Sequence, residues 1–151
     1  MNKFYLTTTI PYVNAAPHIG HALEFVQADV IARYKRSRGD EVYFLSGSDD
    51  NAIKNVQAAE EAGIDVKKFV EQNSKIFEDL LSKLNVSIDQ FIRTTEDRHK
   101  KGAQALWEAT DEKYIYKKTY KGLYCVGCEL FYKQDELNEK GECNDCLLYT
   151  S

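Results

Sequence analysis

The chain has 151 residues, of which 43% are hydrophobic and 29% are charged, and its formal net charge is −4. This composition supports a folded core, and it argues against low-complexity disorder and against a broad basic face that coats nucleic acid. No apolar signal-peptide segment stands near the start, and no stretch approaches the roughly 18 apolar residues that span a membrane. We therefore expect a cytoplasmic protein with no membrane partner.

The order of hydrophobic periods predicts an α/β fold. Apolar and β-branched runs indicate buried strands, and apolar residues at helical spacing, bounded by capping residues and glycines, indicate helices. Strands that alternate with helices are typical of a parallel sheet with right-handed crossovers. The expected strands are 3–9, 41–47 and 90–94, and the expected helices are 20–38, 51–62, 65–83 and 96–113.

Three residues near the last of these helices are given structural roles. Thr95 is available as the N-cap of helix 96–113, since threonine is a preferred capping residue. His99 stands among charged neighbours and is expected to be solvated. Trp107, at helical spacing with Ala103 and Leu106, is expected in the core.

The character of the sequence changes near residue 114. The segments IYKKTYKGLYC and ELFYKQDEL predict short hairpin strands, and the four cysteines of the chain all follow residue 124. We therefore divide the chain into a first domain, 1–114, and a small cysteine-containing part, 115–146. Residues 147–151 are expected to be a non-native tail.

The stretch TTTIPYVNAAPHIGHALEF places His18 and His21 at the start of the first predicted helix. The first N–H groups of a helix that follows a strand lie at the carboxyl edge of the sheet, where phosphates bind readily. Residues i and i+3 share one side of a helix, and Gly20 lets a flat ligand come close. The segment therefore predicts a polyphosphate site without a P-loop. The structural alternative is that Gly20 permits tight helix packing and the histidines only decorate the helix start.

The segment PYVNAAPHIGH, followed by ALEFVQADVIARYKRSRGDEVYFLSGSDD, closely resembles the N-terminal segment of methionyl-tRNA synthetases, which are class I aminoacyl-tRNA synthetases. His18, Ile19, Gly20 and His21 match the HIGH signature of that class letter for letter. The resemblance extends to about Asp145. It implies the first half of a Rossmann-like catalytic domain, with a small zinc-knuckle insertion.

The resemblance also implies roles in binding ATP. His18 and His21 would be catalytic: they would hold the ATP phosphates and stabilise the charge that develops as methionine attacks the α-phosphorus. Gly20 would lie under the adenine. Mg²⁺ would accompany ATP, and the methionyl group would pass from methionyl-adenylate to tRNA(Met).

The methionine site that the resemblance implies involves three positions. Ile10 and Tyr12 would line the side-chain pocket, and Asp49 would bind the ammonium group. A charged amine that leaves water requires such a charge-assisted partner. Asn51 and Ala52 depart from the family, which usually has histidine and glycine there. Asp49 and Asp50 could otherwise be a solvated turn.

The cysteines form two C-x2-C pairs, Cys125 with Cys128 and Cys143 with Cys146, separated by 14 residues. This spacing favours a tetrahedral zinc site over free thiols or disulfides. A shell of four thiolates has no open position, and the resemblance implies a structural Zn²⁺. After Cys146 the sequence stops following the family pattern, so the native chain is expected to diverge near that residue.

The 151 residues contain neither a KMSKS-type loop nor a helical anticodon-binding region. We therefore expect an N-terminal fragment of a methionine–tRNA ligase that is inactive alone; methionine-dependent pyrophosphate exchange by this chain would contradict that. Two alternatives stay open. One is a class I synthetase of cysteine or leucine specificity, and the other is a non-catalytic zinc-containing module that binds tRNA or a protein.

Overall fold

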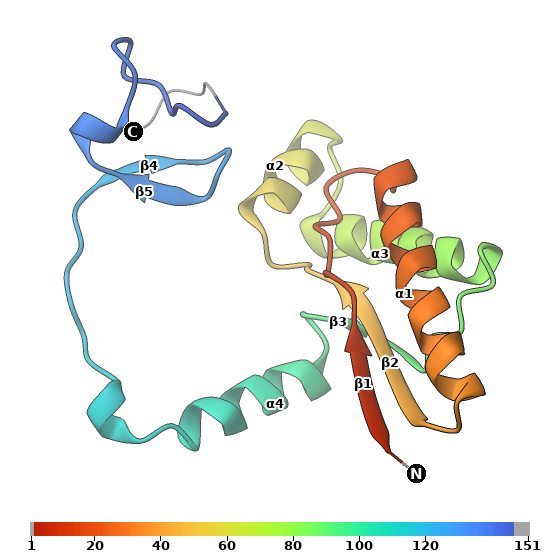
Figure 1. Cartoon of the computed structure of the whole chain (residues 1–151). Helices are drawn as coiled ribbons and strands as arrows, with labels where there is room; N and C mark the ends of the chain where they lie inside the picture. Colours follow the sequence, from red (N-terminus) through yellow and green to blue (C-terminus); the bar gives the residue numbers. More distant parts are fainter. Residues whose placement is uncertain (1, 147–151) are drawn as a thin grey trace. The chain divides into compact units, whose positions relative to one another are not determined.

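The computed structural model describes residues 2–146, which divide into two compact units between Ala109 and Thr110 (Figure 1). Within this described range, no helix has both the length and the apolar character needed to cross a membrane. The assignment of residues 115–146 to a connective insertion stays a prediction. The expected non-native tail, 147–151, lies outside the described residues.

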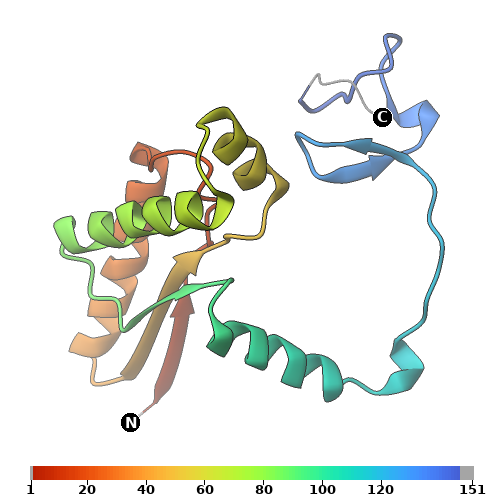
Figure 2. The same cartoon turned by 180° about the vertical axis from the view of Figure 1, so that it is seen from behind.

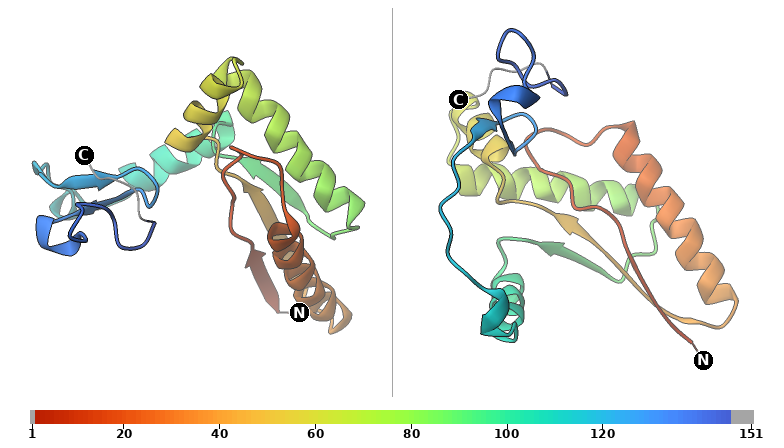
Figure 3. Two further views of the ribbon diagram at one scale, coloured as in Figure 1. Left: turned by 90° about the horizontal axis from the view of Figure 1, so that it is seen from above. Right: turned by 60° about the vertical axis from the view of Figure 1, so that its left-hand side comes forward.

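The first unit has the predicted α/β order. Its sheet is parallel, with strand order β1-β2-β3, and α1 and α3 pack against it (Figure 3). The elements are β1 (Lys3–Thr7), α1 (Ile19–Ser37), β2 (Glu41–Ser48), α2 (Ile53–Glu61), α3 (Val66–Lys83), β3 (Gln90–Arg93) and α4 (Asp97–Glu108). The expected α/β class is confirmed, whereas β1 and α4 end earlier than the sequence pattern indicated.

The core lies between the helices α1 and α3 and one face of the sheet (Figure 2). Phe25 of α1 and Phe77 of α3 are almost fully buried in one cluster, and Phe44 of β2 is buried in a second cluster with alanines of α1. Aromatic side chains of this size contribute much of the apolar area that stabilises a small domain. The core therefore fixes α1, and with it the helix start that carries the histidine pair.

Gly47 brings β2 and β3 into close contact. A β-carbon at this position would lie 2.2 Å from the carbonyl oxygen of Ile92 in the neighbouring strand, so no other residue fits without moving backbone. The close approach sets the spacing of the strand ends, where Asp49 and Thr94 follow β2 and β3.

The predicted roles of Thr95 and His99 were wrong. Thr95 does not cap α4: its hydroxyl donates to Asp50 Oδ2 at 2.6 Å, and the N-cap is Glu96, which makes no side-chain cap bond. His99 is half-buried, with Nδ1 3.0 Å from the carbonyl oxygen of Thr94. Thr95 belongs to the polar network around Asp50 that is described below, and His99 contacts the backbone of Thr94; sequence spacing reveals neither contact.

Trp107 is not in the core. Its side chain is 65% exposed, and no residue of α4 is buried within the described structure. The apolar spacing of Ala103, Leu106 and Trp107 does make one face of a helix. Periodicity shows that a face exists, but it does not show that this unit covers the face.

The second unit, as far as residue 146, contains an antiparallel hairpin and two short 3-10 helices. The hairpin consists of β4 (Leu123–Cys125) and β5 (Leu130–Tyr132), in which Leu123 pairs with Tyr132. The short helices are Glu112–Tyr114 and Gln134–Glu136. Hairpin strands were predicted here, but most of IYKKTYKGLYC precedes the observed strand β4.

Candidate functional site

The histidine pair closes the start of helix α1. His18 is the N-cap, and its Nδ1 accepts from the backbone N–H of Gly20 at 3.1 Å. His21 Nδ1 accepts from the backbone N–H of His18 at 3.2 Å, which completes a reciprocal capping box. Because each Nδ1 is an acceptor, each neutral ring carries its proton on Nε2. The Nε2–H groups are then the donors that remain for a ligand.

The two imidazoles stack, with ring centroids 3.9 Å apart and an interplanar angle of 21°. The His21 ring also meets Phe77 edge-on at 5.2 Å. Burial lowers the pKa of His21 below its ordinary value, the nearby His18 lowers it further, and Glu24 partly opposes this. His21 is therefore uncharged at neutral pH, when it can donate one hydrogen bond without adding charge repulsion to His18.

Gly20 is required by the cap itself. A β-carbon there would lie 2.9 Å from Cε1 and 3.0 Å from Nδ1 of His18. The helix-packing alternative is therefore not the reason for this glycine, since the nearest atoms belong to the capping ring and not to another helix. The position of adenine over Gly20 stays a prediction.

One pocket of about 380 Å³ joins residues predicted to bind methionine with residues predicted to bind ATP. Ile10 and Tyr12 line it together with His18 and His21. Gly20 and Asp49 are not among its lining residues. The whole lining is Thr9, Ile10, Pro11, Tyr12, Asn14, Ala15, Ala16, His18 and His21.

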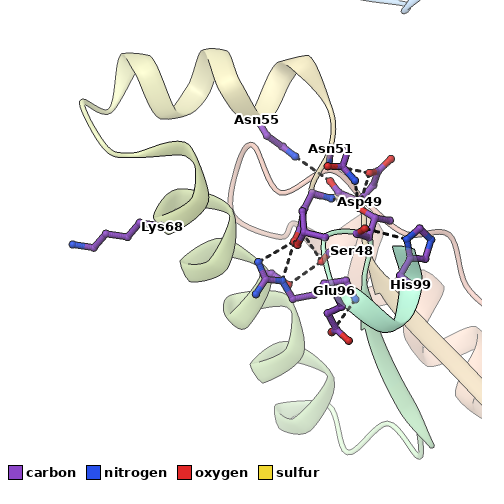
Figure 4. Close-up of polar contacts among 12 residues, drawn as sticks. Ser48, Asp49, Asn51, Asn55, Lys68, Glu96 and His99 are labelled. Carbon is purple, nitrogen blue, oxygen red and sulfur yellow. Dashed lines mark hydrogen bonds and ion pairs between the residues drawn. The ribbon is translucent and has the colours of Figure 1, made fainter. Parts of the chain in front are cut away.

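Asp49 lies beside this pocket because the β1 and β2 chains pair again beyond the sheet, with their register shifted by one residue from that of the strands. Tyr12 and Asp49 form an isolated parallel bridge, and the N–H of Asp49 donates to the carbonyl of Pro11 at 2.9 Å. The Asp49 side chain is half-buried, and Oδ1 accepts from the N–H of Asn51 and the hydroxyl of Thr94, each at 3.1 Å (Figure 4). The structure thus brings Asp49 next to Tyr12, as the predicted site requires.

Asp50 is a residue that sequence analysis underestimated. It is 5% exposed, pairs with Arg93 at 2.9 Å, and accepts hydrogen bonds from the hydroxyls of Ser48 and Thr95. A solvated turn is therefore wrong for Asp50. The signal was available: Ser48 and Asp50 follow the buried Phe44 at strand period, so they share its face.

A second hollow, of about 840 Å³, is larger than the first but contains neither histidine. Charged side chains of both signs line it, including Asp50, Arg93 and Lys100. Its volume alone does not identify a ligand. The smaller pocket is the better candidate because the HIGH histidines and the predicted methionine residues meet there.

The four cysteines gather at one point of the second unit. Their Sγ atoms all lie within 4.8 Å of one another; Cys125 and Cys146 are 3.2 Å apart, and Cys128 and Cys143 are 3.7 Å apart. These separations exceed the roughly 2.05 Å of a disulfide. They are close to the roughly 3.8 Å between ligands of a tetrahedral zinc ion with Zn–S bonds of about 2.3 Å. The cluster therefore fits a closed four-thiolate shell.

The thiols differ in acidity. A hydrogen bond from the Tyr132 hydroxyl is the main cause that lowers the pKa of Cys143 to about 6. A hydrogen bond with Cys146 is the main cause that raises the pKa of Cys128 to about 12. Without a cation, Cys143 is therefore the more acidic of these two thiols.

The family model described as tRNA synthetases class I (M) matches residues 4–150. The chain therefore belongs to the class I tRNA synthetase family of this group. Its fold agrees with that of the Mycobacterium tuberculosis methionyl-tRNA synthetase in complex with methionyl-adenylate: the TM-score is 0.92 at 37% identity, over 100% of this chain and 30% of that one.

Curated relatives carry the particular name methionine–tRNA ligase. The Thermotoga maritima protein is 45% identical over 148 residues, which are 95% of this chain and 24% of the relative. The Rickettsia bellii protein is 47% identical over 137 residues, or 90% of this chain and 27% of the relative. The chain thus spans about a quarter of the length of these relatives.

Proposed function

We propose that this chain provides the methionine- and ATP-binding part of a methionine–tRNA ligase that acts in the cytoplasm. The whole reaction converts methionine and ATP to methionyl-adenylate and pyrophosphate, and then transfers the methionyl group to tRNA(Met). One observation carries the proposal: a single pocket is lined by Ile10 and Tyr12 together with His18 and His21. Similarity to methionine–tRNA ligases over nearly the whole chain supports it.

Methionine would bind at the Tyr12 end of the pocket. Ile10 and Tyr12 would offer apolar surface to the side chain, and Asp49, which forms a β-bridge with Tyr12, would offer a carboxylate to the ammonium group. A charge-assisted hydrogen bond in a half-buried place is stronger than one in water. The pocket would therefore select an α-amino acid with a flexible apolar side chain.

ATP would bind at the start of α1. The cap already uses the N–H groups of Gly20 and His21, so the donors for phosphate would be the Nε2–H groups of His18 and His21, both of which line the pocket. A carboxylate oxygen of methionine would attack the α-phosphorus. The bond between the α-phosphorus and the oxygen that bridges it to the β-phosphorus would break, and pyrophosphate would leave. The histidines would stabilise the added negative charge by hydrogen bonds, without forming a covalent intermediate. Mg²⁺ would accompany ATP and would neutralise part of the phosphate charge.

The cysteine cluster would hold one structural Zn²⁺. Cys125 and Cys143 are fully buried, so these two ligands are shielded from solvent. With four protein ligands the ion has no open position, which excludes it from the activation step at the other unit.

Ligand titration of the purified chain tests the proposed function. We expect L-methionine to bind in preference to L-leucine and L-cysteine. Asp49→Asn should weaken methionine binding at least about tenfold, because it removes a charge-assisted bond, while ATP binding stays unchanged. His18→Ala together with His21→Ala should do the reverse. Glu78→Gln, at an exposed site on α3, is the matched control and should change neither.

The proposed function fails if leucine or cysteine binds as well as methionine, or if Asp49→Asn leaves methionine affinity unchanged. Metal analysis of freshly purified reduced protein tests the zinc site separately. About one zinc per chain is expected, and its absence would contradict the structural Zn²⁺.

A further inference from the structure

The backbone of Asp49 is held on both sides. Its N–H donates to the Pro11 carbonyl at 2.9 Å, and its carbonyl accepts from Asn55 Nδ2 at 3.0 Å. Asn55 is fully buried, and within the described residues its Oδ1 has no hydrogen-bond partner. A buried polar atom without a partner costs stability, so core packing does not account for this amide. The hydrogen bond from Asn55 to the Asp49 carbonyl accounts for it. This bond fixes the backbone of Asp49 but does not orient its carboxylate.

The hydroxyl of Thr94 has a defined direction. Thr94 is 8% exposed, and its Oγ1 accepts from the N–H of Asp50 at 2.9 Å and from Nδ2 of Asn51 at 3.2 Å. A hydroxyl oxygen has two acceptor positions and one proton. With both acceptor positions in use, the proton points to the remaining polar neighbour, Oδ1 of Asp49, at 3.1 Å.

The Asp49 carboxylate is therefore bonded unequally. Oδ1 accepts from the Thr94 hydroxyl and from the N–H of Asn51, and among the described residues the hydrogen bonds of this carboxylate all go to Oδ1. Oδ2 keeps its acceptor capacity. An ammonium group has three donors and no acceptor, so Oδ2 is the atom that it would engage.

We propose that Thr94 is a positioning residue for amino-acid recognition: its hydroxyl, with both lone pairs occupied, fixes Asp49 so that Oδ2 is presented to the substrate ammonium group. This inference rests on the proposed function, in which Asp49 binds that group. It also gives a role to Asn51, which stands in the loop after β2 where the family usually has histidine. The Asn51 amide donates to the second acceptor position of the Thr94 hydroxyl.

Titration of the full chain with L-methionine, with the amine-free analogue 4-(methylsulfanyl)butanoate and with ATP tests the proposal. Thr94→Val keeps the shape and removes the hydroxyl. It should weaken methionine binding about tenfold, the size expected for one hydrogen bond to a charged group. Binding of the amine-free analogue and of ATP should stay within about twofold. Thr94→Ser, which restores the hydroxyl, should recover methionine affinity to within about threefold of wild type.

Asn51→Ala gives a second route if Thr94→Val does not fold, because Asn51 is exposed and its backbone bond to Asp49 remains. It frees one acceptor position of Thr94 and should weaken methionine binding about threefold, without changing ATP binding.

Methionine affinity that is unchanged in Thr94→Val, with a loss in Asp49→Asn, would overturn the role of Thr94 and leave the proposed function intact. Equal loss of methionine and ATP binding in Thr94→Val would show a structural role and also overturn the proposal. If Asp49→Asn itself has no effect on methionine, both the proposed function and this inference fail.

Discussion

The two units of this chain are stabilised in different ways. The first unit buries large aromatic side chains, Phe25, Phe44 and Phe77, between helices and a parallel sheet. In the described part of the second unit, the only buried apolar residues are Cys125 and Cys143, while Phe131 and Tyr120 are more than half exposed. A segment of this size without an apolar core usually requires a metal or disulfides. We therefore expect a metal ion held by the cysteine cluster to stabilise the second unit, as the aromatic core stabilises the first.

Metal removal should have the largest effect, and it should destabilise the second unit while leaving the first unit unchanged. Zinc binding to small domains contributes about 10–16 kcal/mol to folding, so a chelator should unfold the β4–β5 hairpin. Amide hydrogen exchange should show lost protection in residues 110–146 and unchanged protection in the first unit. Cys128→Ser should act in the same direction. If the hairpin keeps its protection after complete metal removal, the comparison between the units is wrong.

Truncation of an aromatic side chain should have the next largest effect. Phe25→Ala leaves a cavity in the cluster between α1 and α3 and should lower the unfolding free energy of the first unit by about 3–5 kcal/mol. Phe131→Ala is the matched control: its ring is 54% exposed, so the loss should be about 1 kcal/mol or less. Urea denaturation measures both changes. Equal losses would mean that the second unit has an apolar core after all.

Most of the fold could be predicted, because the spacing of apolar residues along the sequence indicates which faces of strands and helices are buried. The strands around Tyr5, Phe44 and Phe91 and the helices between them follow from apolar spacing, and Gly39 and Gly63 stand just after helix ends at positive φ. Trp107 shows the limit of this reasoning. An apolar helical face can be recognised in a sequence, but which surface covers it is a tertiary property that spacing does not contain.

The candidate site was predictable in its residues and less so in its connections. The HIGH signature identified His18 and His21, and the two C-x2-C pairs identified a cluster that the structure brings together. The network of Asp50, Arg93 and Thr94 joins β2 to β3 through contacts more than 40 residues apart in sequence. Such contacts depend on strand register, and a single sequence does not reveal register.

Gly20→Ala tests a local contribution within the first unit. The new β-carbon would lie 2.9 Å from the His18 ring, so the ring must turn away and the N-cap is lost, at a cost of about 1 kcal/mol. Gly102→Ala makes the same substitution in α4, where no atom lies within 4 Å, and should stabilise by about 0.5–1 kcal/mol. Opposite signs in urea denaturation are expected. A stabilising Gly20→Ala would show that His18 does not cap the helix.

Acid pH should produce the smallest effect, and it should arise in the first unit from His21. Burial and the charge of His18 lower the pKa of His21 below 6.5 in the folded chain. Between the folded and unfolded pKa values the unfolded state binds more protons, so the unfolding free energy decreases as the pH falls through 6.5.

NMR titration of the His21 ring should give a midpoint below 6.5; a midpoint at or above that value would contradict the burial argument. His21→Asn keeps an acceptor for the cap but does not titrate, and in that variant the decrease should become smaller. All three histidines lie in the first unit, so the histidine-linked pH dependence belongs to that unit provided that zinc stays bound, and the difference between wild type and His21→Asn is the part that arises at the helix start.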